Sequence, residues 1–323
     1  MRTAILGSLL AISFAGFSEV GLLHPAIAQS NPTQSNPVQS SSAISPIKVK
    51  LLSPGTGNRQ TLRFKPVVGT KQLSLMSFDQ ALLIKLAGES LPSVALPLVT
   101  TSIEVVVTKV DANGDIHYQF RYPEVDVKAK PGVQPAIVEA MRSQLKSLQE
   151  IRGSFVMSDR GNIKAAQFDL PETLDPTIRQ VLEQMSQSVN QLSFPFPEEP
   201  VAIGAKWQAS NSPTLNGITL IQTSTYELVD LKNGVATLKF QVEQQASQQR
   251  ITPPPPFPNL QMQLKSLTSQ GEGQSILDLS KPFVQSATLS MKSASQMNVT
   301  NPEVSQEIDM AMQVTVQLNF EPK

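Results

Sequence analysis

The sequence holds few residues that could do acid–base chemistry, and histidine is the scarcest of them. The chain contains two histidines, His24 and His117, and the first lies within an apparent signal peptide. One remaining imidazole could act as a general base, but it builds neither a histidine-based triad nor a histidine metal cluster. Because His117 lies on the polar side of an alternating run, we interpret it as a solvated strand residue.

Two short motifs resemble functional patterns without completing them. The segment 111–115 (Asp-Ala-Asn-Gly-Asp) resembles the start of a calcium loop, but Ile116 and Tyr122 stand where an EF-hand needs Gly and Glu. The pair Ser143 and Lys146 has the Ser-x-x-Lys spacing of serine penicillin-recognising enzymes, yet their Ser-Asp-Asn and Lys-Thr-Gly elements are absent. We therefore predict a protein that is not an enzyme, with no cofactor and no metal.

The composition excludes further classes of function. Among 323 residues, 26 Lys and Arg balance 26 Asp and Glu, and there is no cysteine. A neutral chain has no net field to hold nucleic acid, so we expect no nucleic-acid partner. Without cysteine there are no disulfides, thiolate zinc sites or cysteine nucleophiles.

The N-terminal residues have the layout of a secretory signal. Arg2 precedes the apolar stretch 4–17, and Ala26-Ile27-Ala28 forms a small-x-small cleavage site. The apolar stretch is too short for a membrane anchor, since crossing the hydrocarbon takes about 20 residues. We predict cleavage after Ala28, a periplasmic or secreted location, and no integral membrane segment after cleavage. Residues 29–46, rich in Gln, Asn, Ser and Pro, are expected to form a disordered linker before a β-rich domain at 47–323.

A period of two dominates the chain from Leu62 onward. Apolar and polar residues alternate over 103–107, 116–122, 236–242 and 308–320. Such alternation puts one face of each strand on a core and the other in water, which favours an antiparallel sheet.

Turn residues separate these strands. Asn113-Gly114 and Asn233-Gly234 lie between apolar runs, and both residue types tolerate the positive φ of a type I′ hairpin. Residues 159–162 and 279–282 are expected to form two more hairpins.

Two amphipathic helices are expected within the sheet. The first spans 135–151, and its apolar stripe is Val138, Met141, Leu145, Leu148 and Ile151. The second follows Asp175 and Pro176, which suit an N-cap and a first helical position, and runs to Leu192. Its apolar stripe includes Ile178, Val181 and Met185. Each helix must bury its single apolar face, and we expect both on the concave face of the sheet.

The two halves of the chain share spacings. Asn113-Gly114 and Asn233-Gly234 are 120 positions apart, as are Gly153 and Gly273. This pattern favours an internal duplication with halves at 47–194 and 195–323. The predicted fold is mainly β (α+β): a large curved antiparallel sheet or half-barrel of about 10–12 strands, since open sheets of that size curl. Two consecutive small β-domains are the alternative.

A hollow between the sheet and the helices could hold an apolar ligand. Trp207 is either a core anchor or a pocket wall, and the methionines are either core filler or an adaptable lipid-binding lining. The residues that we expect to line the hollow are Val138, Met141, Leu145, Leu148, Ile178, Val181, Met185, Trp207, Met310 and Met312.

Several runs resemble a family of uncharacterised secreted cyanobacterial proteins. They are LLSPGTGNRQTLRFKPVVGTKQ, TKVDANGDIHYQF, VEAMRSQLKSLQEIRGSFVMSDRGNI and PVAIGAKW, within Val49 to Met297. The resemblance implies a domain of unknown function and carries no catalytic residues. The order of elements is also similar to the half-barrel lipoprotein carriers of the periplasm, in which an incomplete barrel with a helical lid shelters acyl chains. That second likeness concerns the fold alone.

Three functions remain open at this point. The first is a non-enzymatic extracytoplasmic binding protein for a lipid or other apolar small molecule. The second is a structural or protein-interaction module of the cell envelope, with a filled core and an envelope protein as partner. The third, a hydrolase, has neither a Gly-x-Ser-x-Gly elbow nor a triad in its support.

Overall fold

A computed structural model describes residues 47–92, 94–169, 194–215, 218–251, 260–301 and 306–323, and the statements below concern these residues. The predicted signal peptide (1–28), the predicted linker (29–46) and the second predicted helix (175–192) lie outside the described residues.

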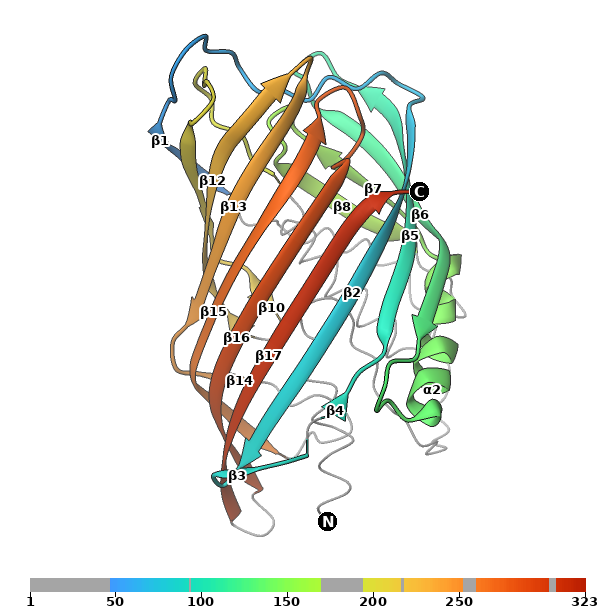
Figure 1. The fold of residues 1–323 in the computed structure, drawn as a ribbon, viewed down its shortest axis with the longest axis vertical. Coiled ribbons are helices and arrows are strands. Elements are labelled where there is room, and N and C mark those ends of the chain that lie inside the picture. The colour runs from blue at the N-terminus through green and yellow to red at the C-terminus, as the bar shows by residue number, and fades with distance from the viewer. Residues whose placement is uncertain (1–46, 93, 170–193, 216–217, 252–259, 302–305) are drawn as a thin grey trace, which may run out of the picture.

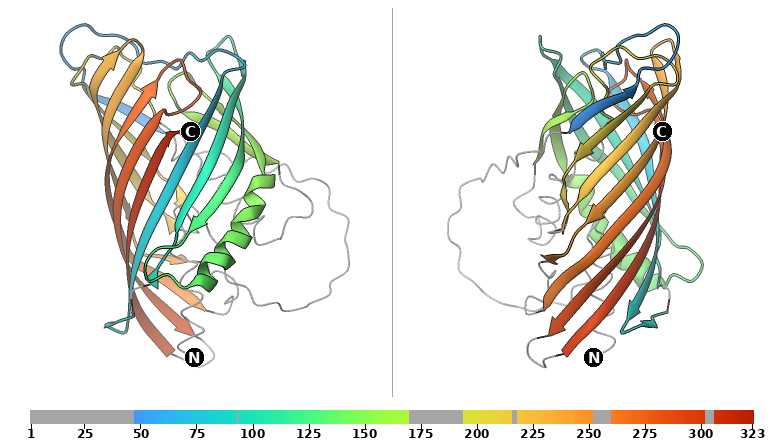
Figure 2. Two further views of the ribbon diagram at one scale, coloured as in Figure 1. Left: turned by 45° about the vertical axis from the view of Figure 1, so that its right-hand side comes forward. Right: turned by 90° about the vertical axis from the view of Figure 1, so that its left-hand side faces the viewer.

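The described chain forms one large, open antiparallel sheet of 15 strands that curls like part of a barrel (Figures 1 and 2). Its main path runs β1-β9-β12-β13-β15-β16-β17-β2-β5-β6-β7-β8, so that β1 and β8 are its edges. The strands of this path are β1 (Lys48–Ser53), β2 (Lys71–Leu86), β5 (Leu98–Val110), β6 (Ile116–Lys128), β7 (Arg152–Met157), β8 (Ile163–Asp169), β9 (Lys206–Asn211), β12 (Ile221–Lys232), β13 (Val235–Ala246), β15 (Gln261–Asp278), β16 (Ser286–Asn301) and β17 (Gln306–Pro322). Short strands β3 (Glu89–Ser90), β4 (Val94–Ala95) and β14 (Gln249–Ile251) pair beside this path, and β10 (Thr214–Leu215) pairs with β11 (Ile218–Thr219).

The sheet is continuous between the two halves of the chain. The C-terminal strand β17 pairs with β2 over thirteen positions, from Met310–Leu86 to Pro322–Ser74. This pairing confirms the predicted large antiparallel sheet. It also means that the halves do not form two separate β-domains, which was the alternative.

Strand β17 shows why the sequence folds in this way. Met310, Met312, Val316 and Phe320 are buried, whereas intervening residues such as Gln317 are exposed. Directly paired residues on neighbouring strands lie on the same face of the sheet. The pairing therefore extends the separation of buried and exposed residues from β17 to its neighbouring strands. We call the face that carries Met310 and Phe320 the inner face.

The hairpins form where they were predicted, but their turns differ. Asn233 and Gly234 both have positive φ, 51° and 79°, as a type I′ turn requires. In the other Asn-Gly hairpin, Gly114 has φ 86° whereas Asn113 is not among the residues with positive φ. There Asn113 Oδ1 instead accepts a hydrogen bond from the backbone N–H of Asp115 at 3.1 Å. The type I′ prediction is therefore wrong for this hairpin, because the longer loop lets the Asn side chain stabilise the turn.

The first predicted helix is present and is mixed in type. Helix α2 (Pro135–Leu145) begins at a proline and continues into the 3₁₀ helix η1 (Lys146–Glu150). Its buried stripe packs against Val99 and Val127 on the inner face of β5 and β6. The helix lies beside the lower end of these two strands, next to the opening of the sheet (Figure 2).

Corresponding turns begin the two halves of the sheet. Before β2, the N–H of Gly69 donates to the carbonyl of Val107 at 2.8 Å. Before β9, the N–H of Gly204 donates to the carbonyl of Leu228, also at 2.8 Å. The pairing register then shifts directly after Val107 in β5 and directly after Leu228 in β12.

A phenylalanine faces a glycine at corresponding places in both halves. Phe120 of β6 pairs with Gly153 of β7, and Phe240 of β13 pairs with Gly273 of β15. A Cβ added to Gly153 would lie 2.6 Å from Phe120 Cε1, and one added to Gly273 would lie 2.5 Å from Phe240 Cζ. Each aromatic ring therefore occupies the space that the missing side chain leaves.

Candidate ligand-binding face

The strand register divides the inner face into rows of side chains. Along β2, β9, β12, β13, β15, β16 and β17, no charged side chain belongs to these rows. Charged residues of the same strands, such as Lys239, Glu272 and Lys292, lie on the outer face. The inner face thus offers apolar groups and uncharged polar groups.

The upper zone of the inner face is a filled aromatic core. Trp207 is fully buried, stacks on Tyr226 with ring centroids 5.6 Å apart, and donates from Nε1 to the carbonyl of Pro195 at 2.8 Å. The segment 54–70 crosses the top of the sheet (Figure 1) and inserts Leu62 and Phe64, which are also buried. Tight aromatic packing and a satisfied indole N–H are typical of a core.

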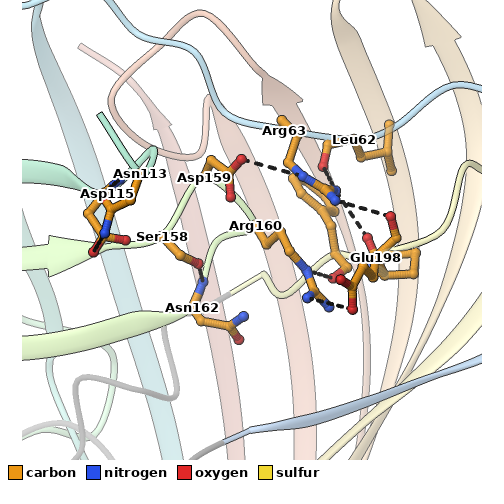
Figure 3. A network of polar contacts seen from close by, with 11 residues as sticks. Leu62, Arg63, Asn113, Asp115, Ser158, Asp159, Arg160, Asn162 and Glu198 are labelled. Atoms are coloured by element: carbon orange, nitrogen blue, oxygen red, sulfur yellow. Dashed lines mark hydrogen bonds and ion pairs between the residues drawn. The ribbon is translucent and has the colours of Figure 1, made fainter. Parts of the chain in front are cut away.

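We call residues 54–70 the closing segment. Arg63 in this segment and Arg160 in the turn after β7 form a network of polar contacts with neighbouring loops (Figure 3). Arg63 donates from Nη1 to the carbonyl of Pro197 at 3.1 Å and forms an ion pair with Asp159 at 3.4 Å. Arg160 donates to the carbonyl of Phe196 at 3.2 Å. These bonds join three segments that are far apart in the sequence, so we interpret the network as a structural clasp.

A row of uncharged polar side chains crosses the middle of the inner face. Successive cross-strand pairs on β9, β12, β13, β15 and β16 place Asn211, Gln222, Gln244, Ser269 and Ser293 side by side. We call these five residues the polar row. Gln244 donates from Nε2 to Gln222 Oε1 at 2.7 Å, and Ser269 is 4% exposed. The row separates the aromatic upper zone from the part below it.

The lower zone is aliphatic and rich in methionine. Its buried members are Leu82, Ile84, Leu220, Ala246, Met262, Leu264, Met297, Met310 and Met312. They form a cluster distinct from the aromatic core. Methionine is flexible and polarizable, so a lining of this kind can adapt to ligands of irregular shape.

The structure distributes the predicted lining residues over separate clusters. Met310 and Met312 lie in the lower zone, Trp207 lies in the upper zone, and Val138, Met141, Leu145 and Leu148 lie in the helix cluster with Val99 and Val127. Ile178, Val181 and Met185 lie outside the described residues. The helix and the two methionines of β17 therefore do not share one cluster, and Trp207 is a core residue with its N–H satisfied.

Sequence reasoning missed the polar row. Its residues come from five strands, and only the register shows that they lie at one height of the sheet. One signal was available in β15, where Ser269, Gly271, Gly273 and Ser275 occupy alternate positions. Such small residues on the inner side of a strand mark a place where something packs closely.

The residues considered for catalysis lie on exposed surfaces. His117 Nε2 is 2.6 Å from Asp111 Oδ2, and Lys109 Nζ is 2.6 Å from Asp111 Oδ1. Hydrogen bonds from Lys109 and then His117 lower the pKa of Asp111. This trio closes a hairpin on the outer side of the sheet, where the pairing is a structural contact.

Ser143 and Lys146 are both exposed on the helical segment. Among the described residues, no group of three or more His, Asp or Glu side chains could hold a metal ion. In the same part of the chain, no helix is long and apolar enough to cross a membrane.

The outer face carries a groove of about 600 Å³ over the strands from β9 to β17. Its lining combines charged and amide-bearing residues, such as Lys206, Glu227 and Gln274, with hydroxyl-bearing and apolar ones, such as Thr288 and Leu289. Lys206 and Glu227, on the neighbouring strands β9 and β12, form an ion pair at 3.4 Å. The charged residues distinguish this groove from the inner face of the same strands.

Comparison with known families concerns the C-terminal half of the sheet. Residues 182–284 match DUF6263, a family of unknown function. The DUF6263 match includes all of β9, β12, β13 and β15, and therefore four of the five polar-row residues. A search of curated proteins found no match.

Proposed function

We propose that the protein is a non-enzymatic extracytoplasmic binding protein whose inner face holds a lipid or another apolar ligand. The observation that carries this proposal is the lower zone: a methionine-rich aliphatic surface on the concave side of an open sheet, separate from the aromatic core. Ligand sites are typically concave and mostly apolar, with a few polar groups that fix the orientation of the ligand. The polar row directly above the lower zone supplies such groups.

A fluorescent apolar probe, N-phenyl-1-naphthylamine, tests this proposal. The wild-type protein should bind the probe saturably and enhance its fluorescence. The double variant Met297→Gln with Met310→Gln should weaken binding about tenfold or more, because both side chains belong to the lower zone and glutamine places polar amides in this apolar lining. Leu83→Gln is the matched control, since Leu83 is 51% exposed on the outer face of β2.

The fold of each variant is checked independently of the probe. Trp207 is the single tryptophan and lies in the upper zone, so its fluorescence and unfolding transition report on the core. A wild-type protein that binds no probe would contradict the proposal. A folded double variant that binds as tightly as the wild type would contradict it equally.

The second candidate is a structural or protein-interaction module of the cell envelope with a filled core. The observation in its favour is the upper zone, which side chains such as Trp207, Phe64 and Phe196 fill completely. On this account an envelope protein co-purifies in a stable complex, and the isolated chain takes up no apolar probe.

Export and internal duplication belong to the proposal as well. The N-terminal signal supports export, and the resemblance to secreted cyanobacterial proteins supports the same location. The repeated turn, bulge and Phe–Gly pair support descent of both halves from one duplicated unit. N-terminal sequencing of the exported protein should begin at Gln29.

A further inference from the structure

We propose that the polar row recognises an uncharged, hydroxyl-bearing head group, so that the ligand is a neutral amphiphile such as a monoacylglycerol. This inference rests on the proposed function, because the apolar chain of the same molecule would occupy the lower zone. It adds the chemical class of the head group and the residues that read it.

The position of the row suits a head group. On β16, Ser293 belongs to the polar row, Ser295 is the next residue on the inner face, and Met297 follows in the lower zone. Residues two apart on a strand are about 7 Å apart, so a molecule bound along β16 passes from polar to apolar lining within about 13 Å. From the row downward, the inner face therefore changes from polar to apolar in the order of the head group and chain of an amphiphile.

The inner face carries buried hydroxyl groups in the row and beside it. Ser269 of the row and Ser295, which follows Ser293 on the inner face of β16, are 4% and 6% exposed. Higher on β15, the buried hydroxyl of Ser275 has no hydrogen-bond partner among the described residues. Buried hydroxyl groups without partners are uncommon in proteins and costly, and a ligand hydroxyl can both donate to them and accept from them.

The absence of charge points to a neutral head group. No inner-face row of the seven strands from β9 to β2 contains a charged residue, so a carboxylate or phosphate would lose its hydration without gaining a cation. The nearest lysine on β16, Lys292, lies on the opposite face. A head group bearing hydroxyls meets donors and acceptors here, whereas an ionised head group meets only neutral dipoles.

Displacement of bound N-phenyl-1-naphthylamine from the purified exported protein tests the inference. Monopalmitoylglycerol should displace the probe at a concentration at least tenfold lower than palmitate at pH 8 does. The double variant Gln244→Leu with Ser269→Ala should weaken monopalmitoylglycerol binding about 25-fold, since each of two lost hydrogen bonds weakens binding about fivefold. Probe affinity is measured separately for the wild type and for this variant, so that each competition is corrected for any change in probe binding.

The control variant carries the same two substitutions on the outer face of the same strands, Gln241→Leu with Ser266→Ala, because both residues are exposed. It should bind monopalmitoylglycerol as the wild type does. If the polar-row double variant unfolds, as judged by Trp207 fluorescence, Ser269→Ala alone replaces it, with about a fivefold effect expected.

The outcomes separate the two proposals. If palmitate competes as well as monopalmitoylglycerol, or if the folded polar-row variant keeps the wild-type preference, the neutral-head inference fails while the apolar-ligand proposal stands. If neither the probe nor any amphiphile binds, both fail.

Discussion

The Phe240–Gly273 pair should make Gly273 one of the least replaceable residues of the sheet. A methyl group at this position would lie 2.5 Å from Phe240 Cζ, and closer still to the backbone oxygen of Thr288. Carbon atoms in contact are normally about 3.5–4.0 Å apart. Gly273→Ala therefore requires Phe240 to leave its place or the backbone to shift.

The expected cost follows from this geometry. Overpacking of this kind typically lowers the free energy of unfolding by about 1–3 kcal/mol, and the stiffer unfolded chain of the alanine variant offsets roughly 0.5 kcal/mol. We expect a net loss of about 2 kcal/mol, or about 4 °C in Tm for a domain of this size. Gly271→Ala is the matched control on the same strand and should lose less than about 1 kcal/mol. A Cβ there would meet side-chain and backbone atoms at 3.2–3.3 Å.

Urea unfolding followed by Trp207 fluorescence measures both variants. Phe240→Leu in the Gly273→Ala background should recover about 1 kcal/mol relative to additivity, because the smaller side chain vacates the clash. The packing argument is refuted if Gly273→Ala is as stable as the wild type. It is also refuted if Gly273→Ala loses no more free energy of unfolding than Gly271→Ala does.

Three further outcomes follow from the described contacts. Burial raises the pKa of Tyr122 and Tyr226 to about 12 and raises that of Tyr118 further, so absorbance at 295 nm should show no tyrosinate near pH 10 until the protein unfolds. Stability should accordingly fall as pH rises above 10, where the unfolded tyrosines ionise. A hydrogen bond from Arg121 lowers the pKa of Glu104. The Glu104–Arg121 pair therefore stabilises the fold fully above pH 4.5, and this stabilisation is lost as the pH falls through the pKa of Glu104 in the folded protein. Glu104→Gln should flatten this acid limb in urea titrations between pH 6 and 3. Arg63→Met should lower Tm by about 2–4 °C and speed proteolysis of the closing segment, since the arginine joins Asp159 and Pro197.

Strand alternation made most of the fold predictable. The inward set on β17, from Ile308 to Phe320, follows directly from period-two patterning, and the first helix follows from its apolar stripe. The turn at Asn113 was harder to predict, because an Asn-Gly pair suits two hairpin types and loop length decides between them.

The candidate site was predictable only in part. Met310 and Met312 could be assigned to an apolar inner face from their strand alone. Trp207 could not be placed from its own strand, because its filled surroundings come from Pro195 and Phe196, which precede β9, and from the distant segment 54–70. The polar row arises from four successive pairings that bring its end residues, Asn211 and Ser293, into one row although they are 82 positions apart, and short-range patterns contain no such register.

Native mass spectrometry of the protein purified from cells tests the central claim most directly. The account predicts a fraction of molecules with one bound apolar molecule, released by organic extraction and diminished in the Met297→Gln and Met310→Gln double variant. A single mass equal to that of the bare chain, with no lipid in the extract and no uptake of added monopalmitoylglycerol, would contradict it.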